Sequence, residues 1–165
     1  MKIAPRLFAA LLFLSILYPV AAAQESALRG TFVLDRQASD DIDRAIEAAV
    51  ARPAARSRLR RTNTAYQRVV INYTQRLVSI TFDQSHSIES PADGTPVKWT
   101  REDGERFDLS TEWQNGRLVQ RFKGEGEERI NSFTVSADGR TLTLNVAIRS
   151  PRLRLVYNLV YMRVS

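Results

Sequence analysis

The side chains best suited to catalysis are few in this chain, and His86 is its only histidine. It lies in the segment Asp83-Gln84-Ser85-His86-Ser87, which contains the three residue types of a Ser-His-Asp triad. Such a triad is assembled from separate elements, and no Gly-x-Ser-x-Gly segment presents a nucleophile here. We therefore interpret this segment as a polar turn between strands and predict that the protein is not an enzyme.

The sequence also contains few residues in patterns suited to binding a metal ion or a phosphate group. The chain has no cysteine and no second histidine, so His86 lacks the further ligands that a zinc site needs. Glu125, Glu127 and Glu128 cluster around two glycines, but their spacing is not that of a calcium loop. A glycine-rich phosphate loop is absent from the sequence. We expect no metal site and no cofactor.

The first 23 residues have the pattern of a secretory signal peptide. Two basic residues precede the apolar run from Leu7 to Val20, and three alanines end at Ala23. The run is shorter than the roughly 20 residues of a spanning helix, and Pro19 interrupts it. We predict cleavage after Ala23, a mature domain of residues 24–165, and a periplasmic or secreted location. An uncleaved membrane anchor is the alternative.

An arginine-rich segment follows further along the chain, with Arg56, Arg58, Arg60 and Arg61 close together. Guanidinium groups form bidentate hydrogen bonds with phosphates and carboxylates. An anionic component of the cell envelope is therefore a candidate partner. The net charge of +6 is modest, and together with the export signal it disfavours nucleic acid. The alternative interpretation is the solvated end of a helix.

Turn-forming dipeptides punctuate the second half of the chain about every ten residues, as in Asp103-Gly104, Asn115-Gly116 and Asp138-Gly139. These dipeptides favour tight hairpin turns, and the runs between them alternate apolar and polar residues like half-buried strands. The expected strands are Gly30–Leu34, Gln67–Tyr73, Arg76–Phe82, Ser85–Glu89, Thr95–Thr100, Glu105–Trp113, Arg117–Lys123, Glu128–Ser136, Thr141–Arg149 and Arg152–Val164. The last of these is apolar on both faces, which predicts a central strand or one covered outside by a helix.

One stretch breaks the alternation. From Ile42 to Val50 the apolar residues recur with helical spacing, and Pro53 ends this helix or begins a second one that reaches Arg61. Consecutive hairpins form a meander, whose exposed edges are removed by closure. We therefore predict an all-β fold, a single antiparallel meander closed into a barrel of roughly 8–10 strands, with one or two short helices inserted after the first strand.

This order of elements resembles the calycin group, which contains the lipocalins and the fatty-acid-binding proteins. The family opens its first strand with Gly-x-Trp, and here Gly30-Thr31-Phe32 has phenylalanine in place of tryptophan. In the family an arginine near the end of the last strand packs across that aromatic ring, a position that Arg163 fits. The resemblance covers residues 28–164 and favours the fatty-acid-binding branch, whose helices also follow the first strand.

The resemblance implies an apolar interior in which a few polar-tipped side chains orient a ligand. The predicted apolar lining is Phe107, Leu109, Trp113, Leu118, Phe122, Leu142 and Leu144. The predicted ligand-binding residues are Trp113, Gln120, Tyr157, Tyr161 and Arg163. In the family an arginine and a tyrosine on the last strand commonly hold a ligand carboxylate, and here Tyr161 and Arg163 occur in reversed order. The alternative is that these side chains belong to an ordinary core and rim.

The expected function is that of an exported lipocalin-like barrel that binds a small hydrophobic or amphipathic ligand without catalysis, with the helical insert as a lid. The alternative is a filled β-barrel that acts as a cell-envelope protein-interaction or structural module. A packed interior without a cavity would favour this alternative.

Overall fold

The computed structural model describes residues 27–74, 76–84 and 86–164. The predicted signal peptide therefore lies outside the described residues. The elements are β1 (Gly30–Asp35), α2 (Ile42–Ala49), α3 (Pro53–Thr62), β2 (Arg68–Tyr73), β3 (Leu77–Phe82), β4 (His86–Pro91), β5 (Val97–Thr100), β6 (Arg106–Gln114), β7 (Arg117–Lys123), β8 (Glu128–Val135), β9 (Thr141–Ser150) and β10 (Leu153–Arg163).

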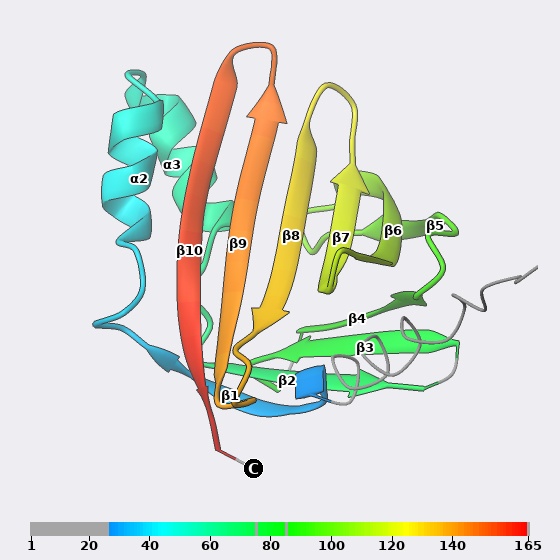
Figure 1. Ribbon diagram of the computed structural model, residues 1–165. Helices are drawn as coiled ribbons and strands as arrows, with labels where there is room; N and C mark the ends of the chain where they lie inside the picture. The colour runs from blue at the N-terminus through cyan, green and yellow to red at the C-terminus, as the bar shows by residue number, and fades with distance from the viewer. Residues whose placement is uncertain (1–26, 75, 85, 165) are drawn as a thin grey trace, which may run out of the picture.

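The ten strands form one antiparallel sheet in the order β4-β3-β2-β1-β10-β9-β8-β7-β6-β5, which curls into a nearly closed barrel (Figure 1). β4 and β5 are its two edges. A hydrogen bond links β4 to β6, the strand next to β5. It joins the Ser90 hydroxyl to the Thr111 hydroxyl, 2.6 Å away. A bridge between Asp93 and Glu112 adds a second link. The predicted all-β barrel with two short helices after the first strand is confirmed.

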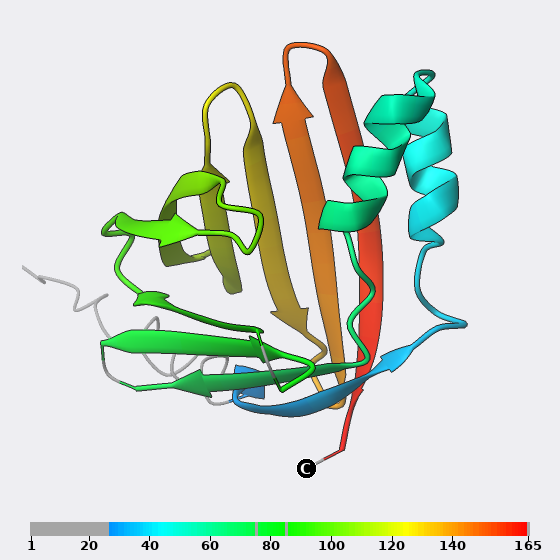
Figure 2. The ribbon, with the colours of Figure 1, turned by 180° about the vertical axis from the view of Figure 1, so that it is seen from behind.

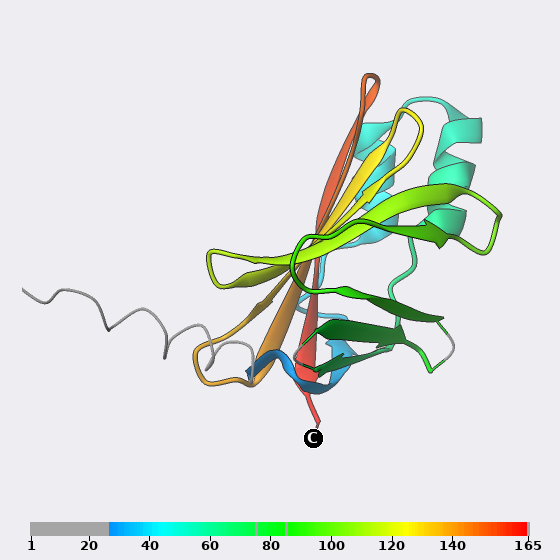
Figure 3. The same ribbon diagram turned by 90° about the vertical axis from the view of Figure 1, so that its right-hand side faces the viewer.

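Figures 1 and 3 show β7 to β10 standing upright, with β1 to β4 lying across their lower end. Both helices lie at the upper end beside β10, and Figure 2 shows α3 on the inner side of the upright strands. The hairpin turns β7–β8 and β9–β10 lie at this same upper end. The upper end of the barrel is therefore the one that the helical insert borders. None of the helices in the described part of the chain is both long and apolar enough to cross a membrane.

Local sequence explains the turns and the helix starts. Asn115 and Gly116 have φ values of 50° and 77°, which a two-residue hairpin turn between β6 and β7 requires. α2 begins after Asp41, whose carboxylate accepts a hydrogen bond from the backbone N–H of Arg44 at 3.1 Å. α3 begins at Pro53, where the missing N–H has no helical partner to lose.

The inner faces of the strands form one apolar core. Six of the seven residues predicted to line the interior are buried, and Trp113 is half-buried. The lower half is densely filled, and its fully buried side chains include Phe32, Ile71, Ile80 and Phe133. The lower half of the barrel is therefore a packed core.

β10 occupies the middle of the sheet, between β1 and β9, as its apolar character predicts. Its outer face is only partly covered, although it is apolar. Val156 and Met162 on the outer face are 56% and 43% exposed. α2 contacts β10, and Ser39 and Asp40 in the preceding loop accept hydrogen bonds from the N–H groups of Val160 and Asn158. This covering is local, so the apolar residues at both ends of the strand face solvent.

Candidate functional site

A cavity of about 570 Å³ lies inside the barrel and is bordered by α3, the β3–β4 turn and the β5–β6 turn. Its volume lies within the range of about 300–1000 Å³ that is usual for ligand pockets. Its apolar wall comes from β3 to β9 and consists of Phe82, Ile88, Trp99, Phe107, Phe122 and Ile148. Its rim is charged and includes Arg58, Arg61, Arg101, Glu102, Asp103 and Glu127.

Aromatic rings pack against one another along this wall. The ring centroids of Trp99 and Phe122 lie 5.2 Å apart, and those of Phe107 and Phe122 lie 6.3 Å apart in an edge-to-face arrangement. On the other side of the cavity, Tyr66 packs on Phe82 at 4.9 Å. Such contacts fix ring orientations and present a rigid apolar surface to the cavity.

Arg129 lies deeper in the cavity than the charged residues of the rim. Arg129 lies on the inner face of β8, between its cross-strand partners Phe122 and Ile148. Its Nε donates to Asn131 Oδ1 at 3.0 Å, and its Nη1 donates to Asn63 Oδ1 at 3.1 Å. The Tyr157 hydroxyl donates to the same Asn63 oxygen at 2.8 Å. These bonds hold the guanidinium in place against the apolar wall.

The charge of Arg129 is not balanced by an acid. Within residues 27–74, 76–84 and 86–164, no carboxylate forms an ion pair with it, and its Nη2 atom donates no hydrogen bond. Burial raises the pKa of Tyr157 and of Tyr66, and the positive charge of Arg129 opposes this rise in both. Both phenols therefore stay neutral at ordinary pH, and the cation remains free to attract an anion.

Below Arg129, a polar row of paired residues crosses the inner faces of five strands at one level, and four of its five members are polar. Thr111 of β6 is paired with Gln120 of β7, which is paired with Asn131 of β8. Through Val146 of β9 the row continues to Tyr157 of β10. The row is closed at its ends by Ser90, which contacts Thr111, and by Asn63, which contacts Tyr157. Every buried polar residue of the described chain belongs to this row or contacts it; these residues are Asn63, Ser90, Thr111, Gln120 and Asn131.

Of the five predicted ligand-binding residues, Gln120 and Tyr157 lie in the polar row on β7 and β10, and neither is among the residues that line the cavity. Trp113 and Tyr161 lie in deeper rows of the packed half. Their Nε1 and hydroxyl groups are buried and have no hydrogen-bond partner within the described part of the chain. Neither residue lines the cavity. Their ligand contacts stay predictions.

Arg163 packs at the lower end of the barrel. Its guanidinium carbon lies 4.5 Å above the ring centroid of Phe32, which confirms the contact expected from the resemblance. Its Nε donates to the Gly139 carbonyl at 2.6 Å, its Nη1 donates to the Arg29 carbonyl at 2.8 Å, and its Nη2 donates to the Ala27 carbonyl. The guanidinium therefore links the end of β10 to the segment before β1 and to the β8–β9 turn. A ligand contact of Arg163 stays a prediction.

Sequence reasoning missed Arg129, Asn131 and Asn63. A signal for the first two was present in the strand pairing, because an antiparallel neighbour places partners on the same face. Val146 and Ile148 lie on the predicted apolar face of β9, and their partners on β8 are Asn131 and Arg129. Asn63 ends α3 and is 94 residues from Tyr157, so no local pattern could have joined them.

The segment around His86 has no triad geometry among its described atoms. The Asp83 carboxylate accepts from the backbone N–H of Arg68 at 2.7 Å, and the acid that contacts His86 Nε2 is Glu102. The His86 ring also packs against Tyr66, with centroids 5.6 Å apart. His86 therefore joins the β3–β4 turn to the β5–β6 turn at the rim of the cavity.

Most of the arginine-rich segment is held by contacts within the protein. Arg60 pairs with Asp43 and Glu47 of α2 at 2.8 and 2.9 Å, and Arg58 pairs with Glu105 at 3.3 Å. Arg56 donates from Nε to the Val50 carbonyl at 2.6 Å. Arg61, in contrast, is exposed at the cavity rim and forms no ion pair within the described residues.

The β5–β6 turn on the opposite rim has its own ion pairs. Arg101 bonds the carboxylates of Asp103 and Glu105 and packs over the Phe107 ring at 5.3 Å. The hydrogen bond from Arg101 lowers the pKa of Asp103 to about 2. The turn is therefore ionised and tied to the cavity wall at ordinary pH. No group of three or more potential metal-ligating side chains occurs in the described chain.

No family model matches the chain, and no curated protein matches it. Solved structures do match. A REP1-NXSQ fatty acid transporter is 18% identical with a TM-score of 0.62, and the match covers 85% of this chain and 98% of that one. A Schistosoma mansoni fatty acid binding protein in complex with arachidonic acid is 14% identical, with a TM-score of 0.58 and coverages of 85% and 98%. Human cRBP IV is 19% identical, with a TM-score of 0.57 and coverages of 83% and 98%. At these identities the likeness shows a shared fold.

Proposed function

We propose that the protein binds a small amphipathic molecule in the 570 Å³ cavity and catalyses no reaction on it. The ligand has an acidic head group, which pairs with Arg129, and an apolar chain, which lies against the aromatic wall. The observation that carries this proposal is a cation that forms no ion pair within the described residues and lies beside the apolar wall of the cavity. Arg129 is partly buried, and a partner of opposite sign stabilises a charge in such surroundings.

The energetics show why the head group matters. A ligand that buries about 300 Å² of apolar surface gains on the order of 7 kcal/mol. Association costs at least about 4 kcal/mol of this. An apolar chain alone would therefore bind weakly. A charge-assisted hydrogen bond with Arg129 would add about 1.5 to 3 kcal/mol to the free energy of binding. The ligand would then bind at lower concentrations.

The fold supports the same class of ligand. The neighbours reported above include a fatty acid transporter and a fatty acid binding protein with arachidonic acid, and their barrels superpose on more than four-fifths of this chain. Because those names describe binding and transport, they favour a non-enzymatic role here as well. The cavity also weighs against the alternative of a completely filled barrel.

Displacement of a fluorescent fatty acid by hexadecanoic acid tests the proposal. The wild-type protein should bind the probe with one site, and Arg129→Gln should weaken binding about tenfold or more, since it removes a charge-assisted hydrogen bond. Arg154→Gln is the matched control because Arg154 is exposed on the outer face of β10. Equal binding by both variants and the wild type, or no binding at all, would refute the proposal.

Export is a second part of the proposal, supported by the basic start, the apolar run and the alanines that end at Ala23. The chain expressed in a bacterial host should accumulate in the periplasmic fraction with Gln24 as its first residue. Intact-mass spectrometry checks this directly. A product that retains Met1, or one confined to the cytoplasm, would contradict it.

An anionic envelope component remains a proposed partner of the arginine-rich segment. The exposed Arg61 at the cavity rim is the residue that supports this proposal, since the other arginines have partners within the protein. Arg61→Gln should therefore weaken retention on vesicles that contain anionic lipid and leave α2 and α3 folded. Unchanged retention would leave the segment with a structural role only.

A further inference from the structure

We propose that Asn131 and Asn63 determine the charge of the ligand, because they hold Arg129 in place without neutralising it. This inference rests on the proposed function, since it takes Arg129 as the partner of the ligand's acid. It deepens that proposal by assigning the residues that select an acid over a neutral molecule with the same apolar chain. An aspartate at either position would take the place of the ligand's acid.

The groups that accept hydrogen bonds from Arg129 in the described chain are all uncharged. Its Nε donates to Asn131 Oδ1 at 3.0 Å. Its Nη1 donates to Asn63 Oδ1 at 3.1 Å and to the Thr62 carbonyl at 3.3 Å. A guanidinium has five N–H groups, one on Nε and two on each Nη. These bonds use the hydrogens of Nε and Nη1, so the two on Nη2 are left for a ligand.

Asn131 is the position at which the fold itself does not require an amide. It lines the cavity from the inner face of β8 and is 4% exposed. Its amide oxygen accepts from Arg129, whereas its amide nitrogen donates no hydrogen bond within the described residues. An aspartate has the same shape and would accept from Arg129 equally well. What distinguishes the two side chains at this position is therefore the charge.

Asn63 fixes the guanidinium from the end of α3. Its Oδ1 also accepts from the Tyr157 hydroxyl at 2.8 Å, and its Nδ2 donates to the Leu59 carbonyl of α3 at 2.8 Å. These bonds determine which side of the amide faces Arg129. An aspartate at position 63 would keep the bonds to Arg129 and Tyr157 and lose the bond to α3. Position 131 is therefore the better one for a test.

A carboxylate in place of the Asn131 amide would change the electrostatics of the cavity. Charge-assisted hydrogen bonds are about twice as strong as neutral ones, so the carboxylate would hold Arg129 firmly and balance its charge. The acid of a ligand would then enter beside a carboxylate, and like charges disfavour each other in partly buried surroundings. The apolar wall of Phe122 and Ile148 would stay unchanged. Binding of the apolar chain should therefore persist while the preference for an acid disappears.

The test compares hexadecanoic acid with hexadecanol, which has the same chain and no charge. Affinities are measured for the wild type, for Asn131→Asp, and for Asn72→Asp, which makes the same change at an exposed position of β2. The wild type and Asn72→Asp should bind the acid at least about tenfold more tightly than the alcohol. Asn131→Asp should bind the alcohol within about threefold of the wild type and show no preference for the acid.

Two further measurements keep the inference testable if Asn131→Asp does not fold. Asn63→Asp changes the charge beside the same guanidinium and should lose the same preference. The wild type alone should bind hexadecylamine at least about tenfold more weakly than hexadecanol, because a second cation would enter beside an unneutralised Arg129.

The outcomes separate this inference from the proposed function. A preference for the acid that persists in a variant able to bind hexadecanol would overturn the inference and leave the proposed function standing. Wild-type binding of hexadecylamine as tight as that of hexadecanol would overturn it too. If the wild type binds neither hexadecanoic acid nor hexadecanol, or binds them equally, the proposed function itself is refuted and the inference falls with it.

Discussion

Two arginines at opposite ends of the barrel show how surroundings decide what a residue does. Arg163 covers the Phe32 ring and donates to three backbone carbonyls, so its donors are used within the protein. Arg129 is anchored by Asn63 and Asn131 and still has an Nη2 group that donates to nothing in the described chain. The first arrangement uses every nitrogen of the guanidinium within the protein, and the second leaves the Nη2 group of Arg129 for the acid that we propose as its partner.

Replacing Arg163 should therefore affect stability. Arg163→Met keeps most of the apolar contact with Phe32 and removes the cation and its three hydrogen bonds. We expect the free energy of unfolding in urea to fall by about 2 kcal/mol. Arg154→Met, on the exposed face of the same strand, is the control and should change little. A loss below about 0.5 kcal/mol would show that the carbonyl contacts contribute little.

The buried tyrosines predict how stability depends on alkaline pH. Burial raises the pKa of Tyr157 and of Tyr161 above the ordinary value of 10.0. Above pH 10 the unfolded chain loses these protons while the folded protein keeps them, so the free energy of unfolding falls as pH rises. Below pH 10 both tyrosines are protonated in the folded and the unfolded state, so their full contribution to the free energy of unfolding is present. Thermal melts from pH 8 to 11 should show this decline.

Tyr161→Phe is the variant that isolates the effect. It removes a buried hydroxyl that has no partner in the described chain, so stability at neutral pH should be kept or raised. The alkaline decline should become shallower than in the wild type. The same decline in both proteins would mean that the Tyr161 hydroxyl already ionises at its ordinary pKa when folded.

At the scale of the elements, the two helices connect opposite sides of the cavity mouth. α3 is bound to α2 through Arg60, which bonds Asp43 and Glu47, and to the β5–β6 turn through Arg58 and Glu105. Surface ion pairs of this kind are weak individually, so they can open at little cost. We therefore expect the contact between α3 and this turn to open when a ligand enters or leaves the cavity.

Locking that contact should slow exchange. Because the chain contains no cysteine, Arg58→Cys with Glu105→Cys provides two unique thiols for a short bifunctional reagent. We expect the cross-linked protein to release a bound fluorescent fatty acid at least about fivefold more slowly than the uncross-linked double variant. Stopped-flow dilution measures both rates. Unchanged release would show that the ligand leaves by another route, such as the gap between β4 and β5.

The elements were predictable because their signals are local. Asn115-Gly116 and the other turn dipeptides mark hairpins on their own, and Pro53 marks a helix start. The inner polar contacts were not predictable in this way. Asn63 meets Arg129 across 66 residues and Tyr157 across 94, and these meetings depend on the closure of the barrel. The inward positions of Gln120 and Tyr157 were predictable because alternation along one strand identifies the inner face.

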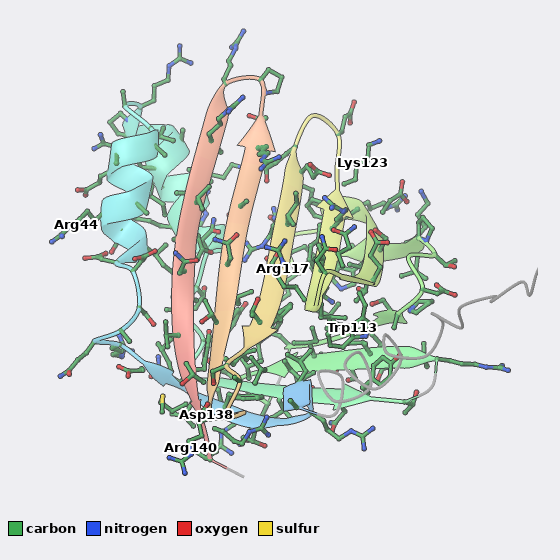
Figure 4. All side chains as sticks on the ribbon, in the orientation of Figure 1. Arg44, Trp113, Arg117, Lys123, Asp138 and Arg140 are labelled. Carbon is green, nitrogen blue, oxygen red and sulfur yellow. The ribbon has the colours of Figure 1, made fainter. Side chains whose placement is uncertain are left out.

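The interior of the whole molecule divides into a packed core and a cavity bordered by α3 and the β3–β4 and β5–β6 turns. The chain has no disulfide to hold it, so the packed core around Phe32 and Phe133 supplies the stability. Figure 4 shows Asp138 and Arg140 at the lower end, with Trp113 and Arg117 by the β6–β7 turn and Lys123 near the upper end of β7. The polar row separates these two parts. The packed core on one side of this row stabilises the barrel around the cavity on the other side.

The most direct test of this account is to locate a bound acid by NMR. Uniformly ¹³C-labelled hexadecanoic acid should saturate one site per chain and show intermolecular contacts with Phe122 and Ile148, on either side of Arg129. Contacts confined to the exposed Val156 and Met162 on the outer face of β10, or no saturable binding, would contradict it.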